Sequence, residues 1–162
     1  MTETKGMSII VKTITRFTVW LIFLYGLYII IHGHLTPGGG FAGGVIISLS
    51  FVHFTLAYGR EFFLKRHKIS TLHNIEAGAG LAFIIIGMLG IAWAGSFLAN
   101  FIDRGTLFTL KSAGTIPLLN IVIGAKAGMA LYLVFYYLTT HRSFPQNYNE
   151  HEVKNEPQNY TK

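Results

Sequence analysis

The chain has 162 residues, and only 12% of them are charged, about half the share of roughly 25% that is usual in soluble domains. Apolar types make up 51% and the mean hydropathy is +0.47, which argues against a soluble domain. The absence of cysteine excludes a disulfide scaffold, a thiol nucleophile and a Cys-ligated zinc site, while the net charge of +6 leaves a nucleic-acid partner to be tested.

Long apolar stretches predict an all-α membrane protein with four transmembrane helices. A cleavable signal peptide is the alternative for the first stretch, but the residues after it show no small-x-small cleavage pattern. Residues 1–140 are expected to form the transmembrane domain, and the polar residues 141–162 a flexible cytoplasmic tail. The four helices are expected at about 14–32, 43–58, 75–97 and 116–138.

The basic residues are distributed unevenly between the ends of these helices. Ten of the 13 fall in the N-terminal segment, the loop between the second and third helices, and the tail. Two lie between the third and fourth helices, and Lys126 lies within the fourth. Because basic residues are enriched on the cytoplasmic side, both termini are expected in the cytoplasm of a multi-pass plasma-membrane protein. The same distribution is a topological signal, which excludes a nucleic-acid surface.

Lys126 is a candidate residue of an ion pathway. It lies ten residues after Ile116, which places it ~15 Å along the fourth helix, near the middle of the membrane. A charge at that depth usually faces a bundle interior, a partner or a water-filled path. Two interpretations stay open: a structural lysine bonded to carbonyl groups or to a partner's acid, and a residue that serves transport.

The sequence offers Lys126 no obvious acidic partner at its own depth. Glu76 is expected at the cytoplasmic start of the third helix, where a carboxylate suits the helix dipole. An ion pair between these two residues is therefore not expected, and the counterpart of Lys126 is predicted to belong to another subunit. Almost opposite Lys126, Gly124 and Gly128 form a GxxxG pair that is expected to pack closely against a neighbouring helix.

His53 is the second candidate for an ion pathway, because a histidine within a membrane helix can relay protons or serve as a hydrogen-bonded packing residue. With Ser50 one turn away, it is also the only candidate nucleophile–base pair, and it lacks an orienting acid. Catalytic residues are therefore not predicted, and the chain is not expected to be an enzyme. His32 and His34 lack a third ligand, so neither a metal site nor a cofactor is predicted.

Residues 36–44 read TPGGGFAGG, which places five glycines and a proline within nine residues. Such a segment cannot begin as ordinary helix, and it allows a tight turn and the close approach of another backbone. A glycine-rich loop before a helix can also bind phosphate. This one lacks the Lys-Ser/Thr pair of a phosphate-binding loop, so a packing turn is the favoured interpretation.

The string from Gly33 to Gly44, GHLTPGGGFAGG, closes one helix and opens the next in a small four-helix chain. It resembles the B-type subunit of the Mrp (Mnh) multisubunit monovalent cation/proton antiporters, and the resemblance covers about residues 8–140. By this resemblance, the functional motif comprises Pro37, Gly38, Gly39, Gly40, Phe41, Gly43 and Gly44.

The resemblance implies an accessory membrane subunit of a Na⁺/H⁺ antiporter, needed for assembly and activity and a candidate for lining part of an ion pathway. Its partners would be the other antiporter subunits, with lipid around them and monovalent cations and protons as the transported species. Some relatives carry a carboxylate near the position of Lys126; a lysine cannot coordinate Na⁺, but it can shift the pKa of a partner's carboxylate. The alternative is a self-sufficient small transporter that works as a homo-oligomer.

Overall fold

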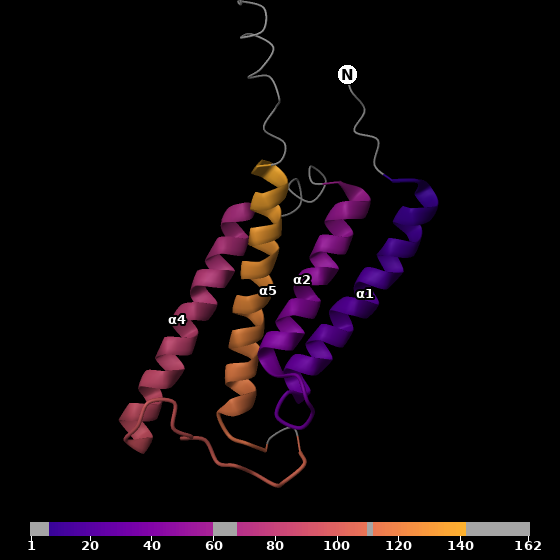
Figure 1. Ribbon diagram of the computed structural model, residues 1–162. Coiled ribbons are helices and arrows are strands. Elements are labelled where there is room, and N and C mark those ends of the chain that lie inside the picture. The colour runs from indigo at the N-terminus through magenta and orange to yellow at the C-terminus, as the bar shows by residue number, and fades with distance from the viewer. Residues whose placement is uncertain (1–6, 60–67, 110–111, 142–162) are drawn as a thin grey trace, which may run out of the picture.

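The structure, a computed structural model, describes residues 7–59, 68–109 and 112–141. Four long α-helices make up most of this part of the chain and run alternately up and down (Figure 1). All four are long and apolar enough to span a membrane, which confirms the predicted all-α fold of four apolar helices. They are α1 (Ile9–His32), α2 (Gly39–Tyr58), α4 (Ile69–Ala94) and α5 (Ile116–His141).

The ends of the helices follow from local sequence. The hydroxyl of Ser8 accepts a hydrogen bond from the amide of Val11 and so caps the start of α1. Helix α4 ends at Ala94 and is capped by Gly95, whose left-handed conformation with φ of 76° suits a glycine. Helix α5 has Pro117 in its first turn, where a missing amide hydrogen costs nothing.

The helices lie roughly in one layer, in the spatial order α1, α2, α5, α4 (Figure 1). Helix α2 packs between α1 and α5, whereas α4 packs almost entirely on α5. In Figure 1 the start of α1 and the end of α5 lie at the same end of the molecule. Because a single layer exposes both of its faces, large hydrophobic side chains on every helix remain accessible in the isolated chain.

The core is small and centres on α5, against which residues of α2 and α4 pack. Tyr132 is 1% exposed and packs with Leu72 and Leu133, and its hydroxyl shares a hydrogen bond of 2.9 Å with Thr55 of α2. These contacts fix the register between the antiparallel helices α4 and α5: Leu72 lies level with Tyr132 and Leu133. This register determines which polar residues of the two helices can meet.

Candidate functional site

An ion pair joins α4 to α5. The ammonium nitrogen of Lys126 donates a hydrogen bond to Oε1 of Glu76 at 2.6 Å. Gly80, one turn beyond Glu76 on α4, leaves room for the lysine chain, since a Cβ atom there would lie 3.2 Å from Lys126 Nζ. The expectation that no carboxylate of this chain reaches Lys126 is therefore wrong.

The register of the two helices explains the error. Helix α4 begins at Ile69, so Glu76 stands two turns inside it and not at its start. Because Leu72 is level with Tyr132 and Leu133, Glu76 is level with residues 128 and 129 of α5, only ~4 Å along the axis from Lys126. The two side chains easily span that offset.

The pair is only partly covered by the chain itself. The side chain of Lys126 is 49% exposed and that of Glu76 is 26% exposed, although both lie well within helices that are apolar enough to span a membrane. Charged groups exposed to hydrocarbon are costly, and they normally face protein or water. The exposed side of this ion pair is thus a place where other protein or water would have to cover the two charges.

A second polar contact lies on the same side of α4. Nε2 of His73 and the hydroxyl of Tyr137 are 2.8 Å apart. His73 precedes Glu76 by three residues, so the two side chains are neighbours on one face of the helix. The α4–α5 contact therefore carries two polar pairs in succession, which we call the polar seam: His73 with Tyr137, then Glu76 with Lys126.

The glycines of the motif bring three helices together. Helix α2 begins at Gly39, after Gly38, and both have positive φ, of 76° and 138°. A Cβ atom at Gly43 would lie 2.8 Å from the carbonyl oxygen of Gly26 on α1. At Gly44 it would lie 2.6 Å from the carbonyl oxygen of Gly124 on α5. Neighbouring glycines thus allow α2 to touch the backbone of a different helix on each of two sides.

The contact of α2 with α5 has a reciprocal form. A Cβ atom at Gly128 would lie 3.1 Å from the carbonyl oxygen of Gly44, and one at Gly124 would meet Ile30 and the carbonyl of Gly40. The structure therefore places the GxxxG pair of α5 against the glycines of α2. The other two motif residues differ, because Pro37 and Phe41 are exposed.

Asn120 connects α5 to the start of α2. Its Oδ1 accepts a hydrogen bond of 3.3 Å from the amide of Gly40, one of the amides at the helix start that have no partner within the helix. Its Nδ2 is buried and finds no hydrogen-bond partner among the residues that the structure describes. Asn120 thus acts as a cap supplied by a different helix.

The other histidines and the serine that the sequence offered as candidate site residues do not come together in the structure. His53 is half-buried on α2 and makes no hydrogen bond within the described residues. The hydroxyl of Ser50 donates to the carbonyl of Ile47 at 2.7 Å, so the two are not a hydrogen-bonded pair. At the other end of the bundle, Nδ1 of His32 contacts the carbonyl of Tyr28, and Nε2 of His34 contacts the carbonyl of Thr109.

Sequence reasoning missed His73 and Asn120 and misplaced Glu76. A usable signal existed for α4, because His73, Glu76 and Gly80 follow one another at helical spacing and therefore share a face. Two titratable residues followed by a glycine on one face of an apolar helix indicate a polar contact with room for a long side chain. No such pattern marks Asn120, whose contact depends on how α5 packs against α2.

Comparison with known proteins identifies the family. Residues 10–133 match the family model described as "Domain related to MnhB subunit of Na+/H+ antiporter". An uncharacterized protein of Methanocaldococcus jannaschii is 32% identical over 83% of this chain and 53% of its own length. The B-type subunit of the Na(+)/H(+) antiporter of Bacillus subtilis is 34% identical over 56% of this chain and 62% of its own.

Two further comparisons agree with these. A putative antiporter subunit mnhB2 of Staphylococcus epidermidis is 30% identical over 72% of this chain and 75% of its own length. A chain of the membrane-bound sulfane sulfur reductase, an archaeal respiratory membrane complex, aligns with a TM-score of 0.65 at 34% identity, over 82% of this chain and 57% of that one.

The chain spans about half the length of the archaeal relative and three fifths of that of the Bacillus subtilis protein. The family match nevertheless covers more than half of the chain, including the glycine motif, α4 and most of α5. The four apolar helices and this match together make the chain a multi-pass membrane protein. It belongs to the family of domains related to the MnhB subunit of Na⁺/H⁺ antiporters.

Proposed function

We propose that the chain is an accessory subunit of a multisubunit Na⁺/H⁺ antiporter in the plasma membrane, with both termini in the cytoplasm, and that it is not an enzyme. The ion pair of Glu76 and Lys126 carries the proposal, because a half-exposed ion pair at membrane depth needs protein or water to cover it. The family match supplies the kind of complex, and the uneven distribution of basic residues supplies the orientation.

The polar seam supports a place beside an ion pathway. His73 and Tyr137 lie about one turn closer than Glu76 to the start of α4, which the proposed orientation puts at the cytoplasmic side. Titratable groups then lead from that side to Lys126 near the middle of the helix. Lys126 is already paired, so it would act by its positive charge on a neighbouring path and not as a ligand of Na⁺.

His53 remains a second candidate for the pathway. It lies on α2, which α5 separates from α4, so a route through His53 would be distinct from the polar seam. We propose a packing role for the motif of Pro37, Gly38, Gly39, Gly40, Phe41, Gly43 and Gly44, and for Gly124 and Gly128, since the glycines of the two sets approach one another within contact distance.

Copurification from native membranes and flux measurements test the proposal. The chain should copurify with larger membrane subunits, and the purified chain alone, reconstituted in vesicles, should show no Na⁺-driven proton flux. Flux from the single chain would refute the accessory function and favour the alternative, a self-sufficient homo-oligomeric transporter.

The role of Lys126 is tested in the assembled complex. Lys126→Ala should lower Na⁺-driven proton flux more than it lowers the yield of complex, because the charge acts on transport. Lys12→Ala is the matched control, since Lys12 is a basic residue in the first turn of α1, away from the polar seam. If Lys126→Ala abolishes assembly, or changes flux no more than the control does, the lysine has no transport role of its own.

A further inference from the structure

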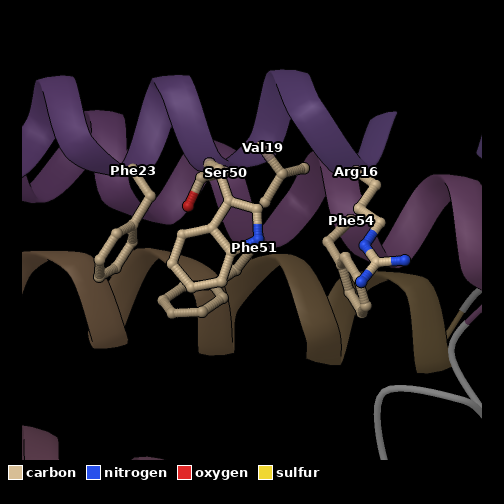
Figure 2. Close-up of a pocket in the computed structure, with 7 residues that line it drawn as sticks. Arg16, Val19, Phe23, Ser50, Phe51 and Phe54 are labelled. Carbon is tan, nitrogen blue, oxygen red and sulfur yellow. The ribbon is translucent and has the colours of Figure 1, made fainter. Parts of the chain in front are cut away.

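A groove lies beside α1 and α2, on the other side of α5 from α4. It has a volume of about 290 Å³ and is lined by Arg16, Val19, Trp20, Phe23, Ser50, Phe51 and Phe54 (Figure 2). Trp20 is 62% exposed, so the groove opens on the surface of the chain. Its volume is at the lower end of the ~300–1,000 Å³ that ligand pockets occupy, which suits one narrow apolar segment.

The walls of the groove are apolar along most of their length. Trp20 and Phe23 meet edge to face with ring centroids 6.1 Å apart, and Phe23 and Phe51 are 6.2 Å apart. Apart from Arg16, the wall has two polar groups: the hydroxyl of Ser50, which donates to the carbonyl of Ile47 and has no further hydrogen to offer, and the indole N–H of Trp20. Because aromatic and aliphatic carbon makes up the rest of the wall, this part of the groove suits a hydrocarbon occupant.

One end of the groove carries a positive charge. Figure 2 shows Arg16 beside Phe54 at that end and Phe23 at the other. Arg16 is exposed and makes no hydrogen bond or ion pair with any residue that the structure describes. The described residues hold only two carboxylates; Glu76 is paired with Lys126, and Asp103 lies in the connection at the opposite end of the bundle.

The depth of the arginine fits the boundary of a membrane. Tyr58, the last residue of α2, donates a hydrogen bond to the carbonyl of Lys12, and Arg16 lies one turn further along α1. A long arginine side chain reaches the interface from such a position while its stem stays in the apolar region. From Arg16 to Phe23 the groove extends ~10 Å toward the membrane centre.

We propose that this groove binds an anionic phospholipid, with the phosphate on Arg16 and one acyl chain along Trp20, Phe23 and Phe51. A phosphate complements the charge of the Arg16 guanidinium, which has no acidic partner among the described residues, and the apolar groove that continues from it suits an acyl chain. In the proposed orientation, the site faces the cytoplasmic leaflet. The site is independent of the polar seam, which lies on the other side of α5.

Tryptophan fluorescence can test the proposal, because the chain has only two tryptophans, Trp20 and Trp93. In the full chain carrying Trp93→Phe, Trp20 is the sole reporter at the groove. The chain is placed in phosphatidylcholine nanodiscs that contain rising fractions of phosphatidylglycerol brominated on its acyl chains. Brominated phosphatidylcholine is the reference lipid. Half-maximal quenching should need about fivefold less phosphatidylglycerol than phosphatidylcholine, since one basic residue near the membrane surface confers roughly that preference.

Three variants separate the contribution of the Arg16 charge from that of the apolar groove. Arg16→Gln should remove the preference for phosphatidylglycerol, whereas Lys12→Gln, a matched loss of charge outside the groove, should keep it. Val19→Phe should fill the groove and reduce quenching by both lipids. Inorganic phosphate in the buffer should not restore the fluorescence, because a free anion lacks the acyl chain.

Four outcomes would overturn the proposal. Equal quenching by the two lipids would mean ordinary contact with bulk lipid, and a preference that survives Arg16→Gln would mean that Arg16 does not bind the phosphate. Restored fluorescence in phosphate would reveal a site for the anion alone. No quenching by either lipid would mean that protein, such as a helix of a second copy, covers the groove.

Discussion

Replacement of Gly44 by alanine tests the close packing of α2 against α5. The added Cβ would lie 2.6 Å from the carbonyl oxygen of Gly124 and 3.1 Å from the amide nitrogen of Gly128, whereas ordinary contact begins at 3.4 Å. Both neighbours are backbone atoms, so no rotation of a side chain can relieve the overlap. Helix α5 would have to move away by about 0.8 Å, and overpacking of this kind costs about 1–3 kcal/mol.

Gly78→Ala provides the matched control. Gly78 also lies within a helix, but a Cβ atom there would meet nothing within 4 Å. Alanine is favoured over glycine in a helix by about 0.5–1 kcal/mol, so this variant should be as stable as the parent chain or slightly more stable. Because both glycines lie within helices, that gain is common to the two variants, which should therefore differ by about 1–3 kcal/mol in their free energy of unfolding.

Unfolding of the purified chain in mixed detergent micelles with increasing dodecyl sulfate, followed by circular dichroism, measures this difference. Gly44→Ala should unfold at a lower fraction of dodecyl sulfate than the parent, and Gly78→Ala at an equal or higher one. Equal stability of the two variants would refute the reasoning, because it would mean that α2 and α5 do not approach as closely as the structure shows.

Three further predictions are tested by the free energy of unfolding or by amide hydrogen exchange. Tyr132→Phe should lower the free energy of unfolding by about 1 kcal/mol, because it removes a buried hydrogen bond. Tyr137→Phe removes a hydrogen bond from a half-exposed tyrosine and should lower it less, so equal losses in the two variants would contradict the prediction. Glu76→Gln and Lys126→Gln should each lower the free energy of unfolding, and the double variant should lower it by less than the sum of the two single effects. The difference, measured as the coupling energy of a double-mutant cycle, should be about 0.5–3 kcal/mol; additive effects would show that the pair does not form. Asn120→Ala should speed hydrogen exchange of the amide that it caps at the start of α2, and an unchanged rate would exclude the cap.

The sequence is sufficient to predict the four helices, because continuous apolar runs are a strong signal. It is less informative about where helices begin. Helix α4 starts with residues such as Ser70, Thr71 and Asn74, which lower the local hydropathy but are still helical. The apolar run therefore begins later than the helix, and this difference led directly to the misplacement of Glu76.

The arrangement of the helices could not be predicted. Small residues on several helices allow many close packings, and the order α1, α2, α5, α4 depends on which of them meet. The ion pair of Lys126 joins residues 50 positions apart, so it requires the register of α4 against α5 to be known to within one turn. The groove beside Arg16 likewise exists only once α1 and α2 are packed together.

The attachment of α4 along one side only has a consequence for the life of the protein in the cell. Outside the proposed complex, the chain leaves most of α4, with part of an ion pair, facing lipid. Proteins that spend time in incompletely packed states are continuously removed by proteases. The half-life of the chain should therefore lengthen when the proposed partner subunits are synthesised with it, which would keep its amount matched to their supply.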